Sequence, residues 1–350
     1  SQFLQSLGYI ADQTSQVGMT GIQQQIWSIE DRLQSRQTAS PPPLGFAEEA
    51  PPEANVVDQA FGALGYSGDP KSPIPLKAPP PAEESARFTY ATWTQGLIDY
   101  EDRTGSYAGT DIGRNTTVGA VLAGADVTVH GVTSTSDAFV IGLVTGEADA
   151  DVINGDGSTL RLHGPMLGAY GAYVNGAFSV DGTFKTDFFQ LMEFSASGVQ
   201  PLGLNNYVLV GNVNYKLTYG NWWVEPTVGV NYTDTVWNGL SKAFGMIDGT
   251  DLRLQGGARV GTGWDWAGIH FTDTLTMLAY DDVSIVGGTL VVALGVPLAP
   301  TDEGKMFGQV INKLEAQLNP NWLVSIEGEF RGRNDVYGTA GRLGVTYLFN

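Results

Sequence analysis

The chain has 350 residues, no cysteine, and 37 acidic against 18 basic residues, which gives a formal net charge of −19. An acidic surface opposes phosphate binding, so nucleic acid is excluded as a partner, and without cysteine there is no disulfide framework and no thiolate metal site. No run approaches the roughly 18 consecutive apolar residues of a membrane-spanning helix. The start at Ser1 lacks the order of a signal peptide, so either processing has removed that signal or the chain is made without one.

Residues 1–37 have a helical period. Apolar side chains recur at spacings of three and four, with Gln, Glu, Asp and Arg between them, and this pattern predicts a narrow-striped amphipathic helix. The apolar seam consists of Met19, Ile22, Ile26, Ile29 and Leu33. Three interpretations stay open: the segment plugs or lines a pore, it forms a homo-oligomer by pairing with a second helix, or it is an idle tether.

Residues 38–87 form a predicted linker. Eleven of the 17 prolines fall there, in clusters such as Pro41 to Pro43 and Pro79 to Pro81. Proline at that density makes an extended spacer rather than a packed unit. Residues 88–350 are then left as one large domain.

Three segments of this domain, 177–188, 206–219 and 222–233, alternate cleanly. In the first, Phe178, Val180 and Phe184 interleave with Asp181 and Lys185, which is the period of a β-strand with one apolar face. The segments are longer than the five or six residues of an average globular strand, and aromatic residues stand at both ends of the apolar face. Both features are typical of membrane β-barrels, whose strands need about 9–11 residues.

Similar segments recur to the end of the chain and predict an all-β, transmembrane, antiparallel up-and-down barrel of about 12 strands. They lie near 88–99, 113–125, 137–147, 159–174, 177–188, 206–219, 222–233, 251–261, 264–278, 306–318, 321–331 and 337–349.

The joins between these segments alternate in length. Turn-forming pairs are found at Asn175-Gly176, Gly220-Asn221, Thr262-Gly263 and Asn319-Pro320, each after an even-numbered strand. Longer connections are expected at 148–158, 189–205, 234–250 and 279–305, while 126–136 is an exception on the short side. Short turns on one side and long loops on the other indicate a closed barrel with both barrel termini on the short-turn side.

The polar face of each strand should line the lumen, because basic residues facing lipid cost about 2–4 kcal/mol each. These residues either hold a plug segment, define an ion-selective channel, or only satisfy one another. The predicted luminal set is Asp181, Lys185, Lys216, Glu225, Arg253, Arg259, Glu327, Arg331 and Arg342.

The last strand carries Leu343, Val345, Tyr347 and Phe349 on one face. Together with the N-terminal helix, the twelve-strand pattern and the segment from His163-Gly164-Pro165 through Gly182 to Asp187, this strand resembles the translocator β-domain of bacterial autotransporters. The resemblance covers roughly 88–349. It implies insertion into the outer membrane of a Gram-negative bacterium by the barrel-assembly machinery, which recognises the last strand, and a pore occupied by the preceding helix.

The histidines and the acidic loops are the candidates for enzymatic or metal chemistry. His270, with Asp265 and Asp273 close in sequence, has the residue types of a general base site, although an ordinary luminal histidine is the simpler interpretation. The acidic run from Glu147 to Asp156 fails the spacing of a calcium loop, and divalent cations bridging such acids to lipopolysaccharide remain a hypothesis. No catalytic residue, metal or cofactor is assigned.

The sequence therefore predicts a non-enzymatic, autotransporter-like outer-membrane barrel that translocates or anchors an N-terminal segment at the cell surface, in contact with membrane lipid and lipopolysaccharide. A porin-type diffusion channel is the alternative, and an outer-membrane hydrolase is the second alternative.

Overall fold

In the computed structural model, nearly all of the barrel is described. The described residues are 29, 88–107, 110–111, 113–134, 137–155, 157, 159–195, 198–243, 246–287 and 304–349. The predicted helix of residues 1–37, apart from Ile29, and the predicted linker 38–87 lie outside these ranges.

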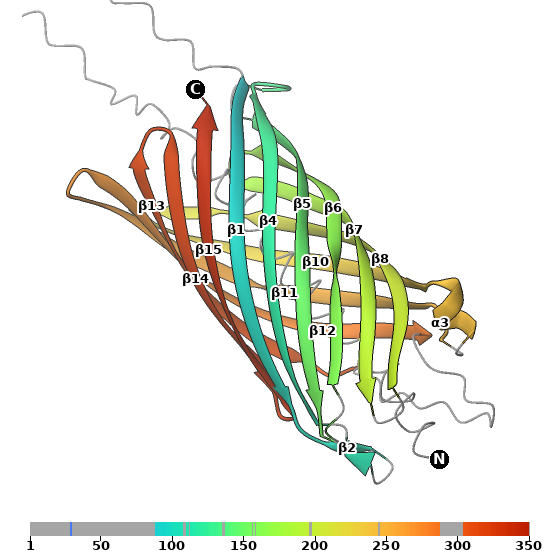
Figure 1. The fold of residues 1–350 in the computed structure, drawn as a ribbon. Coiled ribbons are helices and arrows are strands. Elements are labelled where there is room, and N and C mark those ends of the chain that lie inside the picture. Colours follow the sequence, from blue (N-terminus) through green and yellow to red (C-terminus); the bar gives the residue numbers. More distant parts are fainter. Residues whose placement is uncertain are drawn as a thin grey trace, which may run out of the picture.

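The described residues form one antiparallel sheet closed on itself (Figure 1). Its strands are β1 (Phe88–Arg103), β4 (Arg114–His130), β5 (Asp137–Asn154), β6 (Thr159–Asn175), β7 (Phe178–Ser195), β8 (Gly198–Tyr215), β9 (Leu217–Tyr219), β10 (Trp222–Trp237), β11 (Gly249–Trp266), β12 (Ile269–Gly287), β13 (Phe307–Asn319), β14 (Trp322–Arg333) and β15 (Val336–Phe349). β8 and the three residues of β9 pair with β10 one after the other, so they form one interrupted strand. The thirteen strands therefore make up the twelve walls, or staves, of the barrel.

Pairing between the first and last strands closes the barrel. β15 pairs with β1 over its whole length, from Phe349 opposite Tyr90 to Val336 opposite Arg103, and Figure 1 shows the end of β15 beside the start of β1. All other staves pair with their neighbours in sequence, which is an up-and-down topology. The predicted all-β, twelve-stranded antiparallel barrel is confirmed.

The two ends of the barrel differ. We call the end that holds Phe88 and Phe349 the terminal end and the opposite end the loop end. The loop end carries a small ribbon of β2 (Ser106–Tyr107) and β3 (Thr110–Asp111), and the short helix α3 (Gly239–Ala243). Among the described residues, no helix has the length and apolar character needed to cross a bilayer.

One predicted turn is wrong. Thr262 and Gly263 lie inside β11 and pair with Asp273 and Thr272 of β12, so the predicted strand 264–278 spans the true turn. That turn is Ala267-Gly268, where both residues have positive φ, 53° and 79°. Two successive positive φ values suit the twist of a two-residue hairpin, so the chain reverses there rather than five residues earlier.

Two of the four expected long loops are largely strand, and the other two are strand in part. β7 continues to Ser195 and β8 begins at Gly198, so most of 189–205 extends the sheet, and most of 148–158 and part of 279–305 do the same. β4 also continues to His130, which shortens the unexpectedly long connection at 126–136 to residues 131–136. The alternation of side chains weakens near the loop end, and the predicted strands stopped where it faded.

Exposed aromatic side chains form two bands around the outside. Trp222 and Tyr232 on β10 stand ten residues apart, and Trp322 and Phe330 on β14 eight apart, with exposed Val228 and Ile326 between them. Ten residues at a rise of about 3.3 Å and a tilt of about 40° span about 25 Å, which is the height of the apolar band of a membrane barrel. The outer face is therefore suited to a bilayer.

Candidate functional site in the barrel lumen

The residues predicted to line the pore point to the inside of the barrel. Burial alternates along every stave, and the buried positions are those on the concave, luminal face. Eight of the nine predicted residues are buried there, and Lys216 is half-buried with its Nζ 4.5 Å from the centre of the Trp223 ring. The eight are Asp181, Lys185, Glu225, Arg253, Arg259, Glu327, Arg331 and Arg342.

The luminal wall has an apolar half that the sequence analysis missed. Buried aliphatic side chains cover the inner faces of β5 and β6 and parts of those of β4, β7 and β8, for example Leu122, Val144, Leu162, Leu191 and Leu204. Where a strand carries apolar residues on both faces, as around Leu122 and Val144, the alternation of polar and apolar residues that marks the lumen elsewhere is absent. The expected charged lumen therefore covers only part of the wall.

Ile29, one of the predicted seam residues, is helical and fully buried. It belongs to the same cluster of buried apolar side chains as Trp93 and Leu97 of β1 and the aliphatic residues of β4 to β8. The other four seam residues lie outside the described part of the chain.

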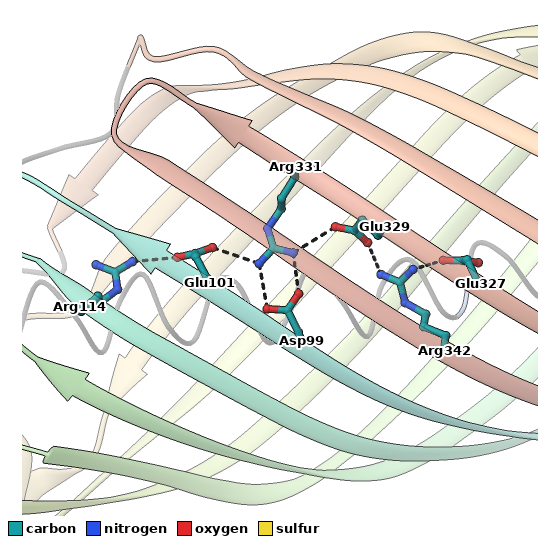
Figure 2. A network of polar contacts seen from close by, with 7 residues as sticks. All are labelled: Asp99, Glu101, Arg114, Glu327, Glu329, Arg331 and Arg342. Carbon is teal, nitrogen blue, oxygen red and sulfur yellow. Dashed lines mark hydrogen bonds and ion pairs between the residues drawn. The ribbon is translucent and has the colours of Figure 1, made fainter.

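The charged half contains a network that we call the closure network (Figure 2). Arg331 of β14 donates to Asp99 of β1 at 2.5 and 2.9 Å, to Glu101 at 3.1 Å and to Glu329 at 3.1 Å. Arg114 of β4 donates to the other oxygen of Glu101 at 3.2 Å. The network thus reaches across β15 and binds both sides of the barrel closure.

Arg342 of β15 completes the closure network. Its guanidinium donates to Glu327 and Glu329, and all three side chains are buried. The network holds four carboxylates and three guanidiniums; Arg331 and Arg342 each lie between carboxylates, and Arg114 pairs with Glu101 at one end (Figure 2). Buried charges are tolerated only when they are paired and hydrogen-bonded in this way.

Only three members of the closure network were among the nine predicted residues. Asp99, Glu101, Arg114 and Glu329 were missed, although Asp99 and Glu101 continue the inward positions of β1 beyond the apolar Leu97. The alternation within the predicted strand 88–99 already places Asp99 inward, and extending it two residues further would have found Glu101.

Amide side chains organise a second polar network around Asp181. The Asp181 carboxylate accepts hydrogen bonds from the amides of Asn212 and Asn214, each at 2.8 Å. Arg259 in turn donates to Asn214 Oδ1 at 3.1 Å and to Glu225 at 2.9 Å. The network joins β7, β8, β10 and β11 and brings together three of the predicted luminal residues.

Two further groups hold the remaining predicted residues. Lys185 Nζ lies 2.8 Å from both carboxylate oxygens of Asp187, and neither side chain is exposed. Arg253 forms an ion pair with Asp282 and lies over the Tyr280 ring, with its guanidinium carbon 4.4 Å from the ring centre.

The Arg253 contact is the first step of a four-residue stack near the loop end. Tyr280 stacks on Phe307 with ring centres 5.0 Å apart and planes within 7°, and the Arg333 guanidinium covers the far side of Phe307 at 4.5 Å. A cation on each outer face of an aromatic pair is favourable, because ring faces carry negative potential. The stack ties β11, β12, β13 and β14 together on the inside.

Glycines make room for large luminal rings. Trp93 lies against Gly124 and Tyr170 against Gly142, and a Cβ at either glycine would overlap the ring. The two rings are joined by a hydrogen bond from Trp93 Nε1 to Tyr170 OH at 2.7 Å, and Tyr170 donates to Asp126 at 3.0 Å. This chain of contacts links β1, β4, β5 and β6 at the apolar wall.

The loop-end helix α3 is fastened to the barrel wall. Ser241 Oγ donates to Gly203 O at 3.0 Å and accepts from Gly203 N–H at 3.1 Å. Asp248 accepts from the backbone N–H of Trp237 at 2.9 Å and from Lys242 Nζ at 2.6 Å. Desolvation opposes ionisation of Asp248, but these hydrogen bonds outweigh it and hold the pKa of the carboxyl below its ordinary value.

The candidate hydrolytic group is only partly assembled. His270 Nδ1 lies 2.9 Å from Asp265 Oδ1 beside the Ala267-Gly268 turn, and both side chains are well exposed. Asp273 alternates to the outer face, where it accepts a hydrogen bond from Asn312 at 2.9 Å. The interpretation that groups Asp273 with His270 is therefore wrong.

The acidic run that was weighed as a calcium loop lies on a strand. Glu147, Asp149 and Asp151 occupy successive outward positions of β5, and Arg161 of β6 pairs with Asp149 at 2.5 Å. In the described part of the chain, no three His, Cys, Asp or Glu side chains converge on a point that suits a metal ion.

The last strand presents its predicted signal residues outward. Leu343, Val345, Tyr347 and Phe349 alternate along β15 with the luminal Arg342. Tyr347 makes edge contacts with Trp322 and Phe349, at ring-centre distances of 4.9 and 4.7 Å. The aromatic end of β15 thus belongs to the outer band at the terminal end.

Comparison with known proteins agrees with this architecture. The family model described as the autotransporter β-domain matches residues 92–328. No curated protein matches the sequence at a significant level.

Three solved structures are similar to this chain. The β-domain of the Bordetella autotransporter BrkA has a TM-score of 0.56 and 14% identity, over 74% of this chain and 98% of that one. The transport unit of AIDA-I from Escherichia coli gives 0.52 and 13%, over 84% and 97%. The translocator domain of NalP from Neisseria meningitidis gives 0.51 and 11%, over 84% and 95%. At these identities the similarity establishes the fold.

Proposed function

Because this chain belongs to the autotransporter β-domain family, we propose that it passes an N-terminal segment through its own barrel, or holds that segment there, so that material is anchored at the cell surface. Its place is the bacterial outer membrane, where the family's barrels reside. The lumen is the path, and residues 1–37 are its resident occupant. The barrel acts as a conduit and carries out no catalysis.

The observation that carries this proposal is the burial of Ile29. A narrow apolar seam needs a matching apolar surface, and the buried aliphatic cluster on β4 to β8 offers one. The polar side of the same helix would face the rest of the wall, which carries the closure network, the Asp181 network and the Arg253 ion pair. An amphipathic helix therefore suits a lumen with one apolar and one charged half better than it suits a uniformly polar channel.

The proposal also assigns an orientation and partners. The terminal end, with its short turns, faces the periplasm, and the loop end faces outward. The outward residues of β15, Leu343, Val345, Tyr347 and Phe349, form the signal for the barrel-assembly machinery. The outer acids of β5 meet lipopolysaccharide at the loop end. Residues 1–37 serve the pore rather than a homo-oligomer.

Conductance in planar bilayers tests the function. The intact chain should show a small or closed conductance, and removal of residues 1–87 should open a large one. A full-length Ile29→Asp variant should give an intermediate, fluctuating conductance, because a carboxylate cannot remain in the apolar cluster. Equal large conductance of the intact and shortened proteins would contradict an occupied pore and favour the diffusion channel.

A further inference from the structure

Gln309 of β13 is a buried luminal residue with an unpaired side chain. It is 2% exposed, and within the part of the chain that the structure describes both Nε2 and Oε1 lack a hydrogen-bond partner. Buried amides are almost always paired, because an amide removed from water without a partner is unfavourable. An unpaired donor and an unpaired acceptor on one planar group call for a ligand that supplies both.

The neighbours of Gln309 are already engaged with one another. Arg331, directly opposite on β14, is occupied by Asp99, Glu101 and Glu329. Leu278 and Ile311, on the adjoining strand and on the same strand, form a small buried apolar pair. Phe307 is held between Tyr280 and Arg333. The amide of Gln309 is thus left free in a wall whose charges are neutralised.

Main chain in an extended conformation matches this amide. The N–H and C=O of one residue in an extended chain point to the same side, so a single side-chain amide can pair with both groups. In a helix both groups are used internally, and they are not available to the wall. The chemistry therefore selects extended polypeptide over helix.

We propose that Gln309 binds the main chain of an extended polypeptide segment in the lumen, and that the resident segment is residues 1–18. These residues precede Met19, so the proposal confines the helix of the predicted segment 1–37 to the part that carries the apolar seam, and they have a single charged side chain, Asp12. A nearly uncharged segment suits a wall where Arg331 is fully neutralised and where Leu278 and Ile311 supply apolar surface. This inference rests on the proposed function, because it needs polypeptide in the pore.

The rate of surface display tests the binding step. An epitope is fused before Ser1, and the rate at which it becomes cleavable by protease added to intact cells is measured for the full chain and for Gln309→Leu. We expect Gln309→Leu to slow appearance several-fold, while Gln317→Leu, a half-buried luminal position on the same strand, leaves it unchanged. Heat-modifiable gel mobility confirms that each barrel is folded.

The outcomes separate the two proposals. Display by Gln309→Leu at the rate of the unmodified chain, with a folded barrel, would overturn the role of Gln309 and leave translocation intact. No display by the unmodified chain would overturn translocation and this inference with it.

A photo-crosslinking amino acid at Tyr9 identifies the resident segment. We expect crosslinks from Tyr9 to β13 in the full chain, and fewer in Gln309→Leu. Crosslinks confined to other strands, or unaffected by Gln309→Leu, would contradict residues 1–18 as the occupant.

Discussion

Arg331 and Asp99 are 232 positions apart in sequence, yet two hydrogen bonds of 2.5 and 2.9 Å join them across β15. Arg331 is on β14 and Asp99 on β1, so this pair bridges the strand that closes the barrel. Neither side chain has water to replace its partner, since Asp99 is fully buried and Arg331 is 3% exposed.

Removal of one partner should therefore be severe. Arg331→Met should lower the free energy of unfolding by about 3–5 kcal/mol, because it leaves Asp99 buried without its cation. The double variant Arg331→Met, Asp99→Leu should recover part of the loss. Urea unfolding in detergent measures both. Arg161→Ala, at an exposed ion pair, is the control and should change stability by less than about 1 kcal/mol. Additive losses in the double variant would refute the coupling.

Gly124 should not tolerate a larger side chain. A Cβ there would overlap the Trp93 ring, so Gly124→Val should destabilise the barrel by about 1–3 kcal/mol. Gly119 is the matched control, because it lies on the same strand with open space where a Cβ would stand. Trp93→Leu should relieve the Gly124→Val defect. A Gly124→Val barrel as stable as Gly119→Val would show that the ring moves freely.

The corrected hairpin makes a prediction of the opposite sign. Ala267 has a φ of 53°, a left-handed conformation that costs a residue with a Cβ about 1–2 kcal/mol. Ala267→Gly should therefore stabilise the barrel by up to about 1 kcal/mol, whereas Ala279→Gly inside β12 should destabilise it. Thermal unfolding of the two variants distinguishes them. Destabilisation by Ala267→Gly would argue against this turn.

The Asp248 contacts at the loop end should weaken in acid. Because the folded-state pKa of Asp248 is lowered, its ionised form supports the loop at pH values above its ordinary pKa of 3.8, and that support is lost as the pH falls through the folded value. The effect is small, since Asp248 and Lys242 are both over two-fifths exposed.

Hydrogen exchange provides the readout. The Trp237 N–H, which donates to Asp248, should lose protection in Asp248→Ala relative to the Asn238 N–H, which donates to the backbone oxygen of Gly203. Equal loss at both amides would indicate general loosening of the loop instead.

The fold could be predicted from sequence because the alternation in β7, β8 and β10 indicates both that they are strands and which face points inward. The same alternation in the other segments predicted the number of strands. The ends of the strands could not be predicted, because near the loop end the strands continue without a bilayer to enforce an apolar outer face. The turn at Ala267-Gly268 was missed because Trp264 and Trp266 lie on the outer face next to it and made the segment look like the start of the next strand.

The site was accessible only in part. Alternation identifies which side chains point inward, and it placed Arg253, Arg259 and Arg331 correctly on the inner face. It does not identify partners, because pairs such as Arg331 with Asp99 arise only when the sheet closes. Nor does it reveal the apolar wall, because strands that are apolar on both faces carry no alternation to read.

Crosslinking of Ile29 to the apolar wall tests the occupied lumen most directly. The chain has no cysteine, so Ile29→Cys can be combined with Leu122→Cys, which is buried on the inner face of β4, or with Val121→Cys, which is 62% exposed on the outer face. In intact outer membranes treated with a short bifunctional maleimide, we predict an intramolecular crosslink to position 122 and none to position 121. Absence of the crosslink to 122, or equal crosslinking to both positions, would contradict a segment held inside the barrel.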